Sequence, residues 1–174
     1  MASTGKVPKR ISGYRRRYPN NDQGDRRVSG TREDRSGDVL DELLRAEGYE
    51  VERRVVPDER EEIAEAIREL AASARLVLTT GGTGLAPRDV TPEATRDVLE
   101  REAPGIAQAL RADSIAKTPH GLLSRGTAGV LCATLVVNLP GSTGGCRDGF
   151  AVLRPALGHA LELLADSPTA HEQT

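Results

Sequence analysis

The sequence predicts a single α/β domain built around a buried parallel strand. Its 174 residues suit one domain of this class. Arg75–Thr80 is an apolar run without alternation, which is typical of a parallel strand that is covered on both faces. This run leads into the glycine-rich stretch Gly81–Gly84, and a helix with a proline near its start follows. A strand that ends in a glycine loop before a helix is a common way to present a ligand-binding loop.

Composition argues against several classes of function. The formal net charge of −2 gives no bulk attraction to nucleic acid or to a membrane surface. No apolar run is long enough to span a bilayer, and the basic N-terminus lacks the apolar core of a secretory signal. Cys132 and Cys146 show no metal-binding spacing, and the three histidines are scattered. We therefore expect a cytoplasmic protein with structural thiols and without nucleic-acid or membrane partners.

The first segment of the chain differs from the remainder. Residues 1–32 contain nine Lys or Arg and only two Asp, whereas the rest of the chain is acidic. We predict an atypical basic segment over 1–28, disordered on its composition, because it offers few apolar residues to bury. The ordered domain is expected over 29–166, and 167–174 reads as a polar tail.

Helical and strand-like segments then alternate, as the spacing of apolar residues indicates. Ser36 is the expected cap of the first helix, and Asp58 with Glu61 resembles a capping box at the second. Thr91 is the expected cap of the third helix, with Pro92 in its first position. The predicted helices span residues 36–47, 58–73, 91–101, 104–117 and 147–165, and the predicted strands span 49–56, 75–80, 126–132 and 134–139. This order lacks the opening strand that a wound α/β sheet normally has.

The glycine loop has the chemistry of an anion-binding site. Because Gly81, Gly82 and Gly84 have no side chains, backbone N–H groups can approach a phosphate, and the hydroxyls of Thr79, Thr80 and Thr83 can add hydrogen bonds. Each charge-assisted bond contributes about 1.5–3 kcal/mol. The loop matches neither the dinucleotide-binding nor the Walker pattern. An ordinary tight turn is the alternative, but three glycines in four residues favour a ligand.

Two aspartates follow predicted strands at the edge where α/β sheets bind their ligands. Asp89 precedes the Thr91 cap, so the helix does not need its carboxylate, although Asp89 could simply form a turn. Asp58 could equally be a helix cap. Two carboxylates at one such crevice can hold Mg²⁺ and position a phosphate for phosphoryl or nucleotidyl transfer.

A second loop, Pro140–Gly145, also precedes a helix and has the size of a phosphate site. The connection before the predicted hairpin contains Ser124 and Arg125. Arg125 is either paired with an anion or solvated, and the residues around it do not decide between these alternatives.

These motifs resemble a known family. Thr79–Pro92 is similar to the signature of the molybdenum cofactor biosynthesis family, the Mog/MoaB proteins, to which the G domain of gephyrin belongs. The resemblance covers roughly residues 29–166. It also includes Glu33–Gly37, Val56–Glu59, Leu123–Arg125 and Asn138–Ser142.

The resemblance implies a three-layer α/β/α sandwich with a mostly parallel sheet, assembled as a homotrimer. It implies a nucleotidyltransferase that moves an adenylyl group from ATP to molybdopterin with Mg²⁺ and releases pyrophosphate. The product would pass to a molybdate-inserting enzyme. Two alternatives stay open: a catalytically weak molybdopterin-binding paralogue, and a non-enzymatic trimeric scaffold or regulator.

The resemblance also assigns roles to individual residues. Asp58 and Asp89 match the two catalytic aspartates, and neither the motifs nor the resemblance says which of them binds the metal. The expected substrate-binding and nucleotide-binding residues are Thr80, Gly81, Gly82, Thr83, Gly84, Ser124, Pro140, Gly141, Ser142, Asp34 and Ser36.

One stretch departs from the family. Members open with an apolar strand, where this chain has Gly13–Asp22 with three consecutive arginines. Burying five apolar residues there would stabilise the fold by on the order of 10 kcal/mol, at about 1.5–3 kcal/mol each, and burying arginines instead is costly. If the three arginines use CGN codons, the DNA that encodes Tyr14–Tyr18 can be translated in the frame that starts one base later. That frame gives Thr or Ile at the first and last positions and Val, Ala, Asp or Gly at the three positions between them. We therefore hypothesise a local frameshift that is restored before Val28.

Overall fold

The structure is a computed structural model that describes residues 10–17 and 35–165. The polar tail predicted over 167–174, and most of the predicted basic segment, lie outside the described residues. In chain order the elements are β1 Arg10–Arg17, α1 Arg35–Ala46, β2 Glu50–Pro57, α2 Arg60–Ala71, β3 Leu76–Thr80, α3 Thr91–Arg96, β4 Arg101–Glu102, α4 Pro104–Lys117, the 3₁₀ helix η1 Pro119–Leu123, β5 Ala128–Leu131, β6 Thr134–Leu139 and α5 Thr143–Ala165.

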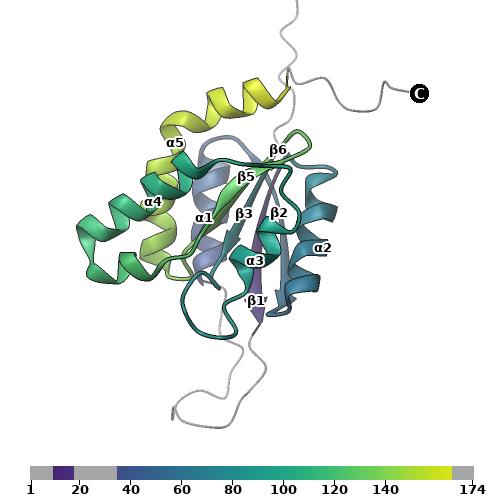
Figure 1. Ribbon diagram of the computed structural model, residues 1–174. Coiled ribbons are helices and arrows are strands. Elements are labelled where there is room, and N and C mark those ends of the chain that lie inside the picture. The colour runs from purple at the N-terminus through teal and green to yellow at the C-terminus, as the bar shows by residue number, and fades with distance from the viewer. Residues whose placement is uncertain (1–9, 18–34, 166–174) are drawn as a thin grey trace, which may run out of the picture.

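The described strands form one six-stranded sheet in the order β2-β1-β3-β6-β5-β4. The first four strands of this order are parallel to one another, whereas β5 and β4 run antiparallel to their neighbours. The expected mostly parallel sheet is therefore confirmed. Because the parallel strands point the same way, the loops that follow β2, β3 and β6 leave from the same edge of the sheet (Figure 1).

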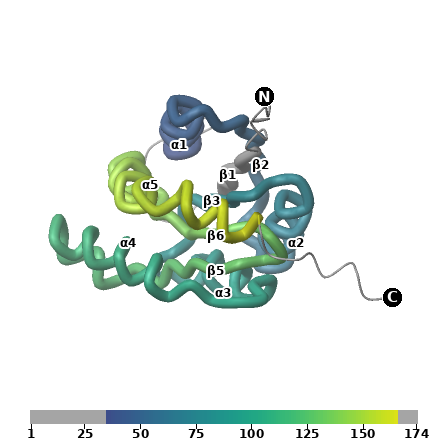
Figure 2. Tube along the Cα trace, turned by 90° about the horizontal axis from the view of Figure 1, so that it is seen from above, coloured from purple at the N-terminus to yellow at the C-terminus, as the bar shows by residue number. Residues whose placement is uncertain are grey.

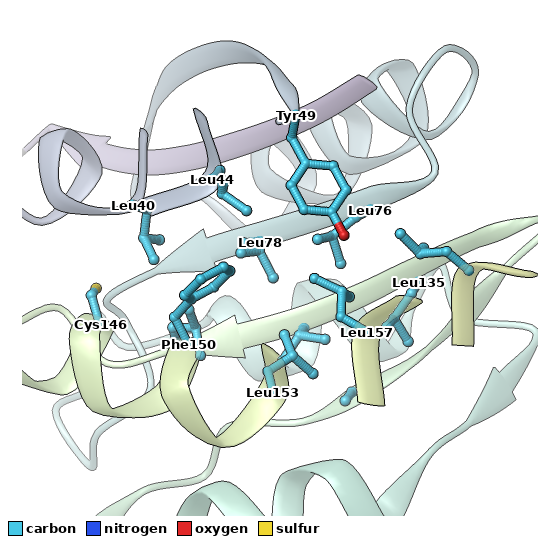
Figure 3. Close-up of a cluster of buried hydrophobic side chains, with 14 of the residues drawn as sticks. Leu40, Leu44, Tyr49, Leu76, Leu78, Leu135, Cys146, Phe150, Leu153 and Leu157 are labelled. Atoms are coloured by element: carbon cyan, nitrogen blue, oxygen red, sulfur yellow. The ribbon is translucent and has the colours of Figure 1, made fainter. Parts of the chain in front are cut away.

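Helices cover both faces of this sheet (Figures 1 and 2). On one face, Leu76 and Leu78 of β3 pack with residues of α1 and α5, among them Leu40 and Phe150 (Figure 3). On the other face, Val77 packs with α2 and α3. Successive side chains of a strand point to opposite faces, so a strand covered on both sides is apolar throughout. The predicted three-layer α/β/α sandwich is confirmed.

The prediction that the fold lacks an opening strand is wrong. β1 lies between β2 and β3 and pairs with both in parallel register, with Tyr14 opposite Arg54 on one side and Thr79 on the other. The prediction relied on apolar side chains, which this stretch does not have. The facing edges of β2 and β3 also offer backbone N–H and C=O groups that need hydrogen-bond partners. A strand placed between them pairs with these groups on both sides, whatever its side chains are. The frameshift hypothesis concerns the identity of the side chains and stays a prediction.

Several predicted helix ends differ from the structure. Glu59, not Asp58, is the N-cap of α2, and its side chain makes no capping hydrogen bond. Val90, not Thr91, is the N-cap of α3. The helix predicted to reach residue 101 ends at Arg96, because the chain turns to the sheet edge, where the Glu100 N–H donates to the Val130 carbonyl at 2.9 Å. Pairing with β5 thus overrides local helix propensity.

The helices over 104–117 and at the C-terminal end of the domain are found as predicted, although α5 begins at Thr143 rather than Arg147. The predicted hairpin is β5 and β6. Among the helices that the structure describes, none is both long enough and apolar enough to cross a lipid bilayer.

Candidate functional site

The glycine loop starts directly at the carboxyl end of β3. Gly81 and Gly82 have φ angles of 83° and 67°, in the left-handed region that side chains disfavour. The Gly81 N–H donates to the Leu139 carbonyl of β6 at 3.0 Å, which fixes the loop to the neighbouring strand. The sequence therefore needs glycine here for the turn itself, whatever ligand the loop binds.

The hydroxyl groups around the loop are not equivalent. The Thr79 hydroxyl accepts a hydrogen bond from the Asn138 amide at 2.9 Å, and Thr79 is fully buried. The expectation that Thr79 can contact a ligand is therefore wrong, because its hydroxyl is used inside the sheet. Thr80 and Thr83 are also buried, at 4% and 8% exposure. Thr83 nevertheless lines a cavity of about 460 Å³ that is described below.

The second predicted loop lies against the first. Pro140–Ser142 connects β6 to α5, and a Cβ atom placed on Gly141 would lie 3.0 Å from the Cα atom of Gly81. The two loops thus meet backbone to backbone, with no room for a side chain between them. The Ser142 hydroxyl accepts from the Gly145 N–H at 3.0 Å, inside the first turn of α5. The adjacency of β3 and β6 explains why loops about 60 residues apart come together.

A cavity of about 460 Å³ opens beside both loops. This volume lies in the range of small-molecule sites. Its wall is partly apolar, with Leu110 and Leu123, and partly polar, with Arg111 and Ser114 of α4. The predicted site residues that line it are Thr83, Gly84, Ser124, Pro140 and Ser142.

A lysine closes one side of this cavity. The Lys117 ammonium donates to Asp113 at 2.8 Å and lies 2.9 Å from an Asp148 carboxylate oxygen, so it joins α4 to α5. Hydrogen bonds to Asp113 and then to Asp148 raise the pKa of Lys117 above its usual value. Lys117 is thus held between two carboxylate groups at the rim of the cavity.

Asp89 lies in the loop between β3 and α3. Its carboxylate accepts from the Ala86 N–H at 3.1 Å, and a Cβ atom placed on Gly84 would lie 2.8 Å from the same oxygen. Asp89 therefore does form a turn, as the alternative interpretation held. It also lines a second hollow of about 410 Å³, together with Glu93 and Arg125.

Arg125 is the residue whose role the sequence left open. Its Nε donates to the Gly84 carbonyl at 2.7 Å, and its two terminal nitrogens bind the Asp89 carbonyl and the Glu93 carboxylate. Arg125 is thus paired with an anion of the protein and is not simply solvated. These partners lie 32 to 41 positions away in the chain, so no local sequence pattern points to them.

The structure separates Asp58 from this group. Asp58 directly follows β2, and β1 lies between β2 and β3. Its two carboxylate oxygens are buried, and it lines neither of the two hollows. Ser36 is buried in the first turn of α1. The predicted site residue Asp34 lies outside the described residues.

Only a minimal metal site fits the donor groups. Within residues 10–17 and 35–165 no group of three or more His, Cys, Asp or Glu side chains could enclose a metal ion. Mg²⁺ commonly binds through one or two carboxylates together with substrate phosphates and water. Asp89 is a single carboxylate at this edge of the sheet and fits that mode of binding, whereas Asp58 follows β2 and is separated from the end of β3 by β1.

Comparison with known proteins agrees with the fold. Residues 23–159 match the family described as "Probable molybdopterin binding domain". The chain is 40% identical over 146 residues to "Molybdenum cofactor synthesis protein cinnamon" from Drosophila melanogaster, an alignment that covers 81% of this chain and 24% of that protein. The chain thus spans about a quarter of that relative's length.

Two further comparisons cover most of both partners. "Molybdopterin adenylyltransferase" from Helicobacter pylori strain J99 is 35% identical over 145 residues, covering 80% of this chain and 82% of that protein. The crystal structure of the molybdopterin biosynthesis enzyme MoaB from Thermus thermophilus superposes with a TM-score of 0.78 at 41% identity, covering 92% of this chain and 99% of the other. This chain belongs to the Mog/MoaB family of molybdenum cofactor biosynthesis proteins.

Proposed function

We propose that the chain is a molybdopterin adenylyltransferase, a nucleotidyltransferase that uses ATP. The observation that carries this proposal is the contact of the two glycine loops at Gly81 and Gly141, beside a cavity that contains Ser124. Two anion-binding loops and one ligand-sized cavity suit a reaction between two phosphate-bearing substrates. The name of the Helicobacter pylori relative supports the same activity.

The loops would hold the phosphate groups. The backbone N–H groups of Gly82–Gly84, and those of Gly141 and Ser142, stand at the sheet edge, and α5 begins immediately after the second loop. The N-terminus of a helix favours a bound anion through its unpaired N–H groups and its dipole. The pterin would occupy the main cavity against Leu110 and Leu123, with Ser124 as a polar partner.

In the reaction, a terminal phosphate oxygen of molybdopterin attacks the α-phosphorus of ATP. The new P–O bond forms as the bond from the α-phosphorus to the bridging oxygen breaks, and pyrophosphate leaves with that oxygen and its electron pair. Catalysis of this kind depends mainly on positioning and on charge neutralisation. Asp89 would help to hold Mg²⁺, which when bound neutralises charge on the phosphates. Asp58 is the second carboxylate of the proposal, on the other side of β1.

The assembly belongs to the same proposal. A homotrimer in the cytoplasm would pass adenylyl-molybdopterin to a molybdate-inserting enzyme. Leu122 is 67% exposed and Ile115 is 39% exposed, which supplies apolar surface outside the cavity lining that a second copy could cover. Sedimentation equilibrium would show three times the monomer mass; a monomer at micromolar concentration contradicts the trimer.

An assay with molybdopterin, ATP and Mg²⁺ tests the activity. We expect adenylyl-molybdopterin on chromatography, with pyrophosphate released in equal amount. Molybdopterin binding without turnover would instead favour the catalytically weak paralogue. A folded protein that binds neither substrate would favour the scaffold or regulator.

A further inference from the structure

We propose that Arg125 is the positioning residue of the transfer reaction, acting through Asp89. This inference rests on the proposed function. The loop that carries Asp89 runs from Gly84 to the start of α3, and most of it lies at the surface, with Leu85 63% exposed. An exposed loop needs a fixed support if its carboxylate is to hold one position.

Arg125 supplies that support from outside the loop. Its backbone N–H donates to the Thr83 carbonyl at 2.8 Å, and its Nε donates to the Gly84 carbonyl at 2.7 Å. A terminal nitrogen donates to the backbone carbonyl of Asp89 itself. The Arg125 side chain therefore joins Gly84, at the beginning of the loop, to Asp89. Because the guanidinium group is planar and rigid, it fixes the positions of these two carbonyl groups relative to each other.

The remaining terminal nitrogen of Arg125 is held as well. It pairs with the Glu93 carboxylate on α3, whose second oxygen is buried without a hydrogen-bond partner among the described residues. Glu93 is thus oriented toward Arg125 by this ion pair. α3 starts directly after the loop, so the pair also ties the loop to the rigid part of the domain.

A second arginine holds Arg125 in place. Arg111 of α4 donates to the Ser124 carbonyl at 3.0 Å and to the Gly126 carbonyl at 3.2 Å, on either side of Arg125. The cavity wall on α4, the Ser124 segment and the Asp89 loop are therefore one connected hydrogen-bonded unit. This connection links the proposed pterin side of the site to the proposed catalytic carboxylate.

Enzyme kinetics of three variants test the role. The first variant combines Arg125→Ala with Glu93→Gln, so that no Glu93 carboxylate is left without its ion-pair partner. The second, Arg125→Lys, keeps the positive charge but lacks the planar guanidinium group. We expect the double variant to lower kcat by about 100-fold and Arg125→Lys to lower it by about 10-fold. In both, KM for molybdopterin should change by less than about threefold. Arg96→Ala, which removes an exposed arginine near the end of α3, should leave kcat unchanged. Full activity of Arg125→Lys would show that only the charge matters and would overturn the positioning role.

A double-mutant cycle shows whether Arg125 acts through Asp89. When two residues act as a unit, removing the second costs little further activity once the first has been removed. In an Asp89→Asn background, the further loss of kcat from Arg125→Ala with Glu93→Gln should be under about threefold. Losses that multiply would mean that Arg125 acts independently of Asp89, and the proposal would fail.

Hydrogen exchange separates this proposal from the proposed activity. In Arg125→Ala with Glu93→Gln, the amides of residues 85–90 should exchange at least about tenfold faster, with unchanged rates in β3 and β6. Unchanged exchange over 85–90 would overturn the support role even in an active enzyme. If the wild-type protein does not form adenylyl-molybdopterin, the proposed function fails. The exchange result still decides whether Arg125 holds the loop.

Discussion

Single residues of the site differ in what holds them in place. Asp89 is oriented by its own loop, through the Ala86 N–H, and by the contact of Arg125 with its backbone carbonyl. Asp58 directly follows β2, and both of its carboxylate oxygens are buried. Glu59 occupies the N-cap of α2, so capping of this helix does not explain why Asp58 carries a carboxylate. Substitution by asparagine preserves size and removes charge, which makes it the informative change at both positions.

We predict that Asp89→Asn lowers turnover by at least about 100-fold, the scale of removing one key electrostatic group. The turn should survive, because the asparagine side-chain oxygen can still accept from the Ala86 N–H. Initial rates of pyrophosphate release measure the effect. Asp97→Asn is the matched control, since Asp97 lies at the end of α3 and makes an exposed ion pair with Arg60. Turnover of Asp89→Asn at the wild-type rate would remove Asp89 from the mechanism.

For Asp58→Asn we predict a loss of turnover of at least about tenfold, or about 1.4 kcal/mol in the activation free energy. The melting temperature should stay close to that of the wild type, because the N-cap residue of α2 is unchanged. Rates and thermal melting of the same preparation separate the two effects. Wild-type turnover with a lowered melting temperature would make Asp58 a structural residue only.

At the scale of elements, the site depends on the close approach of the turns that follow β3 and β6. Neighbouring parallel strands bring Gly81 and Gly141 together, and each glycine leaves room for the other's backbone. The apolar pattern predicted both strands and the glycines predicted both loops. Their contact could not be predicted from composition, because it depends on which strands are neighbours in the sheet.

We predict that Gly141→Ala weakens ATP binding by about tenfold, which is about 1.4 kcal/mol. The new Cβ atom would lie 3.0 Å from the Gly81 Cα atom, so the backbone of one loop has to move. Calorimetry with ATP and Mg²⁺ measures the affinity. Gly158→Ala is the control: nothing lies within 4 Å of its Cβ atom, and alanine should stabilise α5 by about 0.5–1 kcal/mol. Unchanged ATP affinity in Gly141→Ala would show that the loop contact does not shape the site.

At the scale of the whole molecule, the apolar pattern predicted most elements and a parallel strand covered on both faces, since burial on two faces leaves a clear signal. The three-layer sandwich with a mostly parallel sheet came from the resemblance to the family. The sequence could not predict β1, because strand pairing there depends on backbone groups of β2 and β3 rather than on its own side chains. It left the role of Arg125 open for a related reason. The partners of Arg125 come from another part of the chain, and only the fold brings them together.

The place of β1 inside the sheet sharpens the frameshift hypothesis. β1 pairs along one side with β3, whose residues are all buried, and the backbone sets Arg15 opposite Thr80. A strand flanked on both sides in a covered sheet is normally apolar. Tyr14–Tyr18 supplies three arginines instead, and the same DNA read one base later can encode Thr-Ala-Val-Val-Thr. The position of β1 in the sheet thus agrees with the apolar reading that the codon arithmetic allows.

We predict that sequencing the gene across codons 11–30 shows one insertion or deletion near codon 14 and a compensating change before Val28. An intact reading frame through this stretch would rule out the frameshift. The protein gives a second measurement: replacing Tyr14–Tyr18 by Thr-Ala-Val-Val-Thr should raise the free energy of unfolding by several kcal/mol, at about 1.5–3 kcal/mol for each fully buried large apolar side chain. Denaturant titration measures this difference. A replaced chain no more stable than the original would mean that β1 tolerates its arginines.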